Sequence, residues 1–172
     1  MSYIYDNLEL LTITYKSNHI IYNSIKNISK KFKITIVENS NDLNFKQNIE
    51  KRTNTNCILT GENKGFGSAF NIGAKTIKSK YILHFNPDAM INDSVIENLY
   101  NNVEKTDFGI ISVKQSNDQT KILNNTCNLI EVDNVKGFVM LIKNSVIKEV
   151  NYFDENFFLY LEEIDLCKRL KK

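Results

Sequence analysis

Cysteine is scarce in this sequence: there are three residues, Cys57, Cys127 and Cys167, and they form no CxxC pair. An odd number of widely spaced cysteines makes no disulfide framework, so we expect reduced thiols buried as small apolar side chains. The two histidines, His19 and His84, are not spaced like the ligands of a zinc site. The cysteines and histidines therefore predict neither a disulfide scaffold nor a zinc centre.

Long apolar runs and strong net charge are also missing. No run of about 18 apolar residues occurs, so no membrane span is predicted, and the start MSYIYDNLEL lacks the basic region of a signal peptide. The formal net charge is only +2, which indicates no nucleic-acid partner. We therefore expect a cytoplasmic protein. The basic segments at 30–32 and 168–172 leave peripheral contact with the inner face of an anionic membrane open, and solvated surface is the simpler explanation.

What the sequence does contain is a regular alternation of strand and helix patterns. With 172 residues, 42% apolar and 24% charged, the chain can form one domain with a buried core. The alternation predicts an α/β fold with a mainly parallel, Rossmann-like central sheet and helices on both faces. We expect strands at 8–15, 33–40, 57–61, 81–85 and 108–115, and helices at 17–32, 65–80 and 92–105, capped by Ser17 and by Asn92 or Asp93. A polar loop or hairpin at 115–125, a strand running into a helix near Asn144 at 135–150, and a helical segment within 157–172 complete a single domain over 1–172.

Polar side chains follow four of the predicted strands, at the point where each strand ends. Ligands of such sheets bind at the carboxyl ends of the strands, so we expect these groups to face one crevice. This convergence carries more weight than any single motif. The residues concerned are Thr14, Tyr15, Glu38, Asn39, the segment 61–63, Asn86 and Asp88.

A glycine-rich segment, ENKGFGSAFNIGAK at 62–75, leads into the helix after the third predicted strand. Gly65, Gly67 and Gly73 would let the backbone approach a phosphate at the helix N-terminus, and they would serve equally well in a tight turn. The spacing is not GxGxxG and no GK[ST] follows, so neither a dinucleotide fingerprint nor a P-loop is supported.

The only proline stands beside an acid at the end of a predicted buried strand, in FNPDA at 85–89. A carboxylate at Asp88 can hold a divalent cation that bridges two phosphates, because hard cations prefer oxygen ligands. A turn residue, or a cap for the following helix, is the structural alternative.

Three acids, Glu162, Glu163 and Asp165, gather near the start of the last predicted helix. One of them can act as a general base that takes a proton from an attacking hydroxyl. Acids in a first helical turn are also favoured by the helix dipole, which is a structural reason for their presence. Upstream, Gly137 in VKGFVM precedes an apolar strand, where a β-bulge or a strand entry explains it equally well.

Taken in order, six segments resemble the family 2 glycosyltransferases of GT-A fold, especially the rhamnosyltransferase-like branch of bacterial polysaccharide synthesis. The segments are LLTITYKS, ITIVENSN, ENKGFGSAFNIGAK, YILHFNPDAMI, VKGFVMLIKNSVI and YFDENFFLYLEEIDLCKRL. The resemblance spans about residues 9 to 170. It implies a single GT-A-type domain, and since relatives continue past the last motif, we expect a domain that is short at its C-terminal end.

The resemblance also implies a role for each matching residue. The nucleoside would be held by Thr14, Tyr15 and Glu38, and the nucleotide-sugar pocket would be lined by Asn63, Gly65, Gly67 and Asn71. Asn86, Pro87 and Asp88 would take the place of a DxD motif, with Asp88 holding Mg²⁺ or Mn²⁺. Gly137 and Phe138 would lie near the sugar and the acceptor, and Glu163 would be the base, with Glu162 as the alternative.

The function implied by the resemblance is that of an inverting glycosyltransferase. It would move a sugar from a UDP- or dTDP-linked donor to a hydroxyl of a glycan or lipid-linked acceptor. A non-catalytic sugar-nucleotide or glycan-binding domain that needs a partner is the alternative. A nucleotidyltransferase ranks lower, because TYKSNH follows the first predicted strand where that class carries a basic glycine-rich loop.

Overall fold

The computed structural model describes residues 2–103, 105–113 and 129–171. The helices are α1 (Ser2–Asn7), α2 (Asn18–Ile25), α3 (Leu43–Ile49), α4 (Phe66–Thr76), α5 (Asp93–Tyr100), α6 (Asn144–Glu149) and α7 (Glu162–Leu170). The strands are β1 (Leu8–Thr14), β2 (Lys33–Glu38), β3 (Thr55–Leu59), β4 (Tyr81–Phe85), β5 (Ile110–Ser112) and β6 (Val139–Lys143).

The strands form one sheet in the order β3-β2-β1-β4-β6-β5. β1 pairs in parallel with β2 and β4, and β2 pairs in parallel with β3, so the predicted mainly parallel sheet is confirmed. β6 runs antiparallel to both β4 and β5. Because of this reversal, the amino end of β6 lies beside the carboxyl end of β4, with Val139 opposite Phe85.

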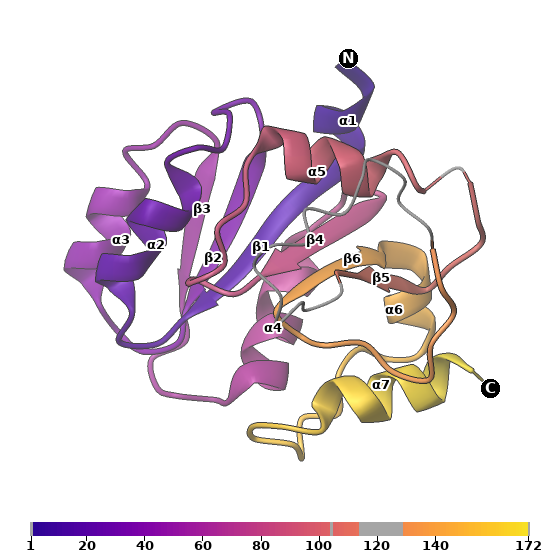
Figure 1. Ribbon diagram of the computed structural model, residues 1–172. Coiled ribbons are helices and arrows are strands. Elements are labelled where there is room, and N and C mark those ends of the chain that lie inside the picture. Colours follow the sequence, from indigo (N-terminus) through magenta and orange to yellow (C-terminus); the bar gives the residue numbers. More distant parts are fainter. Residues whose placement is uncertain (1, 104, 114–128, 172) are drawn as a thin grey trace, which may run out of the picture.

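Alternate side chains of each strand enter two different apolar cores, one on each face of the sheet. In β1, Leu8 and Leu10 pack with α1, α2, α3 and α5, whereas Leu11 packs with α4, α6 and α7. β4 follows the same two-residue period, since Leu83 belongs to the first core and Ile82 to the second. Figure 1 shows α1 and α5 above the sheet and α4, α6 and α7 below it. The prediction of helices on both faces is confirmed.

Local side chains decide where several elements begin and end. The helix predicted over 17–32 ends at Ile25, and Ser17 forms no capping bond. The Ser17 hydroxyl instead accepts from the Tyr15 N–H at 3.3 Å. Asn92 caps α5 as predicted, because its side chain accepts from the Val95 N–H at 3.0 Å. The short helix α1 was not predicted.

The end of the predicted strand 108–115, the polar segment 115–125 and Cys127 lie outside the described residues. Cys57 and Cys167 are free and buried, as expected. Within the described ranges, no helix combines the length and the apolar character that a membrane span requires.

Candidate active site

The carboxyl ends of β1 and β2 are joined at the edge where ligands of parallel sheets bind. The Asn39 N–H, directly after β2, donates to the Thr14 carbonyl at 2.7 Å. Thr14 is fully buried, and its hydroxyl has no hydrogen-bond partner among the described atoms. Tyr15, the next residue, is exposed. The predicted nucleoside contacts at this strand end are therefore one buried hydroxyl and one exposed aromatic ring.

Glu38 ends β2 and is buried. Its Oε1 accepts from the Ser40 hydroxyl at 2.7 Å, and its Oε2 accepts from the Asp42 N–H at 3.1 Å. These hydrogen bonds replace those that the carboxylate would make with water, and they fix the turn that leads to α3. The acid that we expected to hold a nucleoside is thus engaged by its own loop.

Asn39 ties the end of β2 to the loop before α4, a role that the sequence analysis missed. Its Nδ2 donates to Asn63 Oδ1 at 2.9 Å and to the Gly65 carbonyl at 3.1 Å. Its Oδ1 accepts from the Lys64 N–H at 3.0 Å and from the Thr60 hydroxyl at 3.2 Å. The available signal was an amide directly after a buried strand, where an unpaired polar group would be costly.

The glycines of the predicted phosphate segment face protein atoms. A Cβ on Gly65 would lie 2.2 Å from the Phe158 carbonyl oxygen, and a Cβ on Gly67 would lie 3.2 Å from Phe153 Cβ. A Cβ on Gly73 would lie 2.5 Å from a β1 side chain. Gly65 also has φ +79°, a conformation that favours glycine. Close internal packing thus accounts for the three glycines, and a phosphate contact of this segment stays a prediction.

Asn71 was predicted to line the nucleotide-sugar pocket, and in the structure its amide is bound by protein groups. The residue is only 1% exposed. Its Nδ2 donates to the Phe153 carbonyl at 2.9 Å and to Glu155 Oε1 at 3.1 Å, while its Oδ1 accepts from the Phe153 N–H at 3.1 Å. Since both amide hydrogens are bound by protein, Asn71 braces the 153–155 segment beneath the surface.

The turn after β4 carries the acid that we expected to hold a cation. The Asn86 N–H donates to the Phe138 carbonyl at 2.8 Å, and the Ala89 N–H closes the turn by donating to the Asn86 carbonyl at 2.9 Å. Asp88 is exposed on this turn. In the described part of the chain, no group of three or more His, Cys, Asp or Glu residues could hold a metal ion. Asp88 therefore offers a single carboxylate at this edge.

Glu163 reaches the same edge from the last helix. A Cβ on Gly137 would lie 3.9 Å from Glu163 Oε1, so this carboxylate lies beside the residue that precedes Phe138. Phe138 in turn binds Asn86 through its carbonyl. The antiparallel pairing of β4 and β6 thus brings Asn86 beside Phe138, and α7 adds Glu163 next to Gly137.

Glu162 has a different environment from its neighbour. It is only 5% exposed, and its Oε2 has no hydrogen-bond partner among the described atoms. Burial, and to a smaller extent the charge of Glu163, raise the pKa of Glu162. Asp165 is bound elsewhere, in an ion pair with Arg169 at 2.8 Å. Among the three acids, Glu163 is the one that combines partial exposure with a place beside Gly137.

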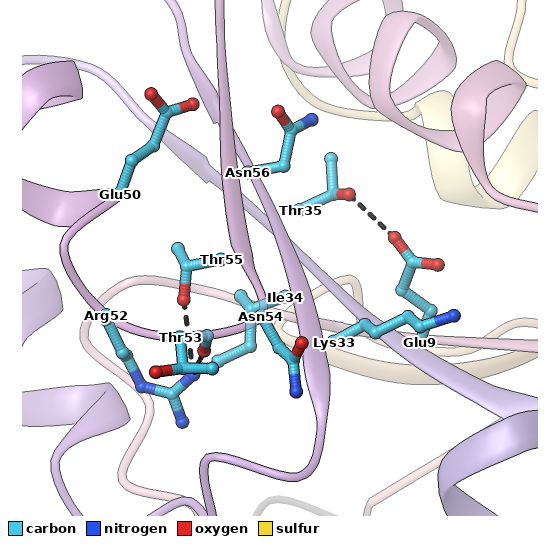
Figure 2. A pocket seen from close by; sticks show the side chains of 10 residues that line it. All are labelled: Glu9, Lys33, Ile34, Thr35, Glu50, Arg52, Thr53, Asn54, Thr55 and Asn56. Carbon is cyan, nitrogen blue, oxygen red and sulfur yellow. Dashed lines mark hydrogen bonds between the residues drawn. The ribbon is translucent and has the colours of Figure 1, made fainter.

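The two cavities described in the structure lie away from this edge. Figure 2 shows the first, of about 320 Å³, at the amino ends of β1, β2 and β3. Its polar groups bind one another: the Thr35 hydroxyl donates to Glu9 Oε1 at 2.7 Å, and Arg52 Nη1 donates to the Thr55 hydroxyl at 3.2 Å. The second, of about 230 Å³, lies between α2 and α3. Neither is lined by a predicted site residue, so the candidate site is the open carboxyl edge.

We expect Glu162→Gln to stabilise the protein at neutral pH. The pKa of Glu162 in the folded state lies above its unfolded value of 4.5. Below pH 4.5 the carboxyl is protonated in both states, and its contribution to the stability of the fold is then fully present. That contribution is lost as the pH rises through the folded pKa, because the buried group must then ionise. A neutral amide avoids this loss, so the variant should be more stable than the parent at pH 7, and this advantage should shrink toward pH 4.

Urea unfolding at the two pH values measures this difference in the free energy of unfolding. Glu149→Gln, which removes an exposed acid on α6, is the matched control and should change stability by less than about 0.5 kcal/mol. A Glu162 variant that is no more stable than the parent at pH 7 would refute the expectation.

Comparisons with known proteins show the family of the chain. The sequence model of the family described as "Glycosyl transferase family 2" matches residues 10–165. The chain is 28% identical over 192 residues to the low-salt glycan biosynthesis hexosyltransferase Agl10 of Haloferax volcanii, covering 97% of this chain and 62% of that protein. It is 25% identical over 175 residues to the rhamnosyltransferase WbbL of Escherichia coli K12, covering 81% of this chain and 66% of WbbL. The chain thus spans about two thirds or less of the length of these relatives.

Solved structures share the fold at low sequence identity. Staphylococcus aureus TarS 1-349 in complex with UDP-GlcNAc has a TM-score of 0.70 at 16% identity, over 95% of this chain and 53% of that one. The mannosyltransferase PcManGT from Pyrobaculum calidifontis, in complex with GDP-Man and Mn²⁺, has a TM-score of 0.73 at 13% identity, over 95% of this chain and 51% of that one. The GT-A fold predicted from the sequence segments is confirmed. Because the family model matches most of its length, the chain belongs to glycosyl transferase family 2.

Proposed function

We propose that this chain binds a nucleoside-diphosphate sugar at the carboxyl edge of the sheet and transfers the sugar, with inversion, to a hydroxyl of a glycan or lipid-linked acceptor. The observation that carries the proposal is the position of Glu163 Oε1 beside Gly137, one residue before the carbonyl that binds Asn86. A partly exposed carboxylate here can take a proton from a hydroxyl while a donor lies against the end of β4.

The donor would lie along the ends of β1 and β4. Tyr15 offers an exposed ring on which a nucleobase can stack, and base-on-aromatic stacking contributes about 1–3 kcal/mol. Asn86 and Asp88, on the turn after β4, would face the ribose and the diphosphate. Asn39 and Asn63 would keep the neighbouring loop in place rather than contact the donor, because they are bonded to each other.

Asp88 fits a divalent cation of the type that binds few protein ligands. Its exposed carboxylate supplies one or two oxygens, and the remaining ligands of Mg²⁺ or Mn²⁺ would be phosphate oxygens and water. When bound, such a cation neutralises negative charge on the leaving diphosphate.

Glu163 would act on the acceptor. As the acceptor oxygen forms its bond to the anomeric carbon, on the face opposite the diphosphate, the bond from that carbon to the diphosphate oxygen breaks. The hydroxyl proton passes to the Glu163 carboxylate. Phe158, Leu159 and Tyr160, which precede α7, are exposed large apolar side chains and offer a surface for the sugar rings of an acceptor.

The named relatives support the donor class and the reaction. One is called a hexosyltransferase and the other a rhamnosyltransferase, and two structures that share this fold hold UDP-GlcNAc or GDP-Man. The PcManGT structure also holds Mn²⁺, which supports a divalent cation beside Asp88.

Calorimetric titration with UDP, dTDP and GDP, each with and without Mn²⁺, tests the proposal. We expect one nucleotide to bind with a dissociation constant between about 1 μM and 1 mM, and we expect Asp88→Asn to weaken this binding mainly when Mn²⁺ is present. Asp6→Asn, which changes an exposed acid on α1 at the opposite edge, is the matched control. A folded protein that binds none of the nucleotides would refute the proposal. Nucleotide binding without sugar transfer to any acceptor would favour a non-catalytic binding domain.

A further inference from the structure

His84 is a histidine inside the sheet to which the sequence analysis assigned no role. It is fully buried in β4, opposite Leu11 of β1. Its ring packs at steep angles against two rings of α4, with centroid distances of 5.1 Å to Phe66 and 5.7 Å to Phe70. A polar ring in such apolar surroundings is stable only if its nitrogens find hydrogen-bond partners.

The two ring nitrogens have different partners. Nδ1 lies 3.1 Å from the Leu11 carbonyl oxygen, and Nε2 lies 3.3 Å from Asn86 Oδ1. A backbone carbonyl only accepts, so the shorter contact places a hydrogen on Nδ1. Burial lowers the pKa of His84 to about 4, although the bonds to Asn86 and Leu11 and the nearby Gly137 backbone oppose this shift. The ring is therefore neutral at pH 7, and Nε2 carries a lone pair.

A lone pair on Nε2 attracts a hydrogen-bond donor and repels an oxygen. A half rotation of the Asn86 side-chain amide exchanges its oxygen and nitrogen without changing its shape. It places Nδ2 next to the imidazole instead of Oδ1. Nδ2–H then donates to Nε2, and Oδ1 points away from the ring. In this arrangement the neutral imidazole has a partner at both nitrogens.

We infer that His84 is a positioning residue that holds the Asn86 amide with its oxygen toward the ligand side of the carboxyl edge. This edge then presents a hydrogen-bond acceptor two residues before Asp88. An acceptor at this place selects a hydroxyl group of the ligand and disfavours a phosphate oxygen. The statement about the ligand rests on the proposed function, whereas the orientation of the amide does not.

Nitrogen-15 NMR of the imidazole rings tests the orientation without any ligand. The chain has two histidines, so a His19→Gln variant assigns the signals. At pH 7 we expect the neutral Nδ1–H form of His84, with a scalar coupling between Asn86 Nδ2 and His84 Nε2 across the N–H···N bond. Two results would overturn the inference: a hydrogen on Nε2, which the Gly137 backbone near the ring would favour, and a doubly protonated ring.

Asn86→Asp provides a second spectroscopic test. A carboxylate cannot donate to Nε2, and its charge favours a hydrogen there. We therefore expect the pKa of His84 to rise in this variant, with the hydrogen on Nε2 appearing at a higher pH than in the parent. Unchanged His84 signals would overturn the contact on which the inference depends.

Titrations of two His84 variants with UDP, dTDP and GDP test the effect on binding. His84→Gln keeps an oxygen that accepts from Asn86, and we expect it to bind within about twofold of the parent. His84→Phe keeps the ring packing but frees the amide, and we expect about two- to tenfold weaker binding, according to the fraction left in the competent orientation. Equal binding by the parent and His84→Phe would overturn the positioning role. If the parent binds no nucleotide, the proposed function fails and the NMR result alone decides the orientation.

Discussion

Glu163→Gln is expected to lower the rate of sugar transfer by at least about 100-fold, while the affinity for the nucleotide stays within about twofold. The amide has nearly the same shape as the carboxylate, so it should keep the packing beside Gly137, where a Cβ would lie 3.9 Å from Glu163 Oε1. The side-chain amide that replaces the Glu163 carboxylate cannot accept a proton at neutral pH, so the acceptor hydroxyl would have to attack without a base. Loss of rate without loss of donor binding is the signature of a group that acts in the transition state.

Two further variants make this result specific. Glu162→Gln changes the adjacent acid, which is buried and has a raised pKa, and a larger loss of rate in this variant would transfer the role of base to Glu162. Glu149→Gln, on the surface of α6, should leave the rate unchanged. Undiminished transfer in Glu163→Gln would reject its role. Steady-state rates and nucleotide titrations on the same preparations give both quantities.

Gly65→Ala should have the largest effect on stability, about 2–4 kcal/mol. Its backbone, with φ +79° and ψ 175°, lies in a region that is essentially restricted to glycine and costs an L-residue about 1–3 kcal/mol. The new methyl group would also lie 2.2 Å from the Phe158 carbonyl oxygen, a backbone atom that cannot move away while it accepts from the Phe66 N–H at 3.0 Å. Losing that hydrogen bond adds about 1 kcal/mol. Because Phe158 lies just before α7, we also expect slower transfer through displacement of Glu163.

Gly61→Ala separates the two causes. Gly61 has a similar φ of +82°, and a Cβ there would meet nothing within 4 Å. This variant should show a backbone cost of about 1–3 kcal/mol without the clash. Urea unfolding of both variants measures the difference. Equal destabilisation of the two would show that the contact between α4 and the segment before α7 contributes nothing.

Strands and helices with a clear period of apolar side chains could be predicted from the sequence, because these side chains alone decide which face is buried. β1 is an example: Leu8 and Leu10 enter one core and Leu11 the other. The cap of α5 at Asn92 could also be predicted, since the Val95 N–H that it binds is only three residues away. Ser17 failed as a cap because its hydroxyl binds the Tyr15 N–H instead. The sequence offered no means of choosing between these two local bonds.

The parts of the site that were not predictable depend on contacts between distant segments. Asn71 looked like a pocket residue, yet its partners are Phe153 and Glu155, more than 80 residues further along the chain. Gly65 looked like a phosphate contact, and the atom against it belongs to Phe158. Short-range patterns carry no information about such pairings, whereas the ordered set of family segments implied that Glu163 returns to the edge near Gly137.

The carboxyl edge is braced mainly by asparagine amides, at Asn39, Asn63 and Asn71. Amides neither gain nor lose protons in the physiological range, and dissolved ions screen their hydrogen bonds far less than they screen exposed ion pairs. The hydrogen bonds between these amides and backbone groups should therefore change little with acidity or ionic strength. A pH dependence of the transfer rate would then report on the ionisable side chains at this edge and not on a loss of this amide bracing.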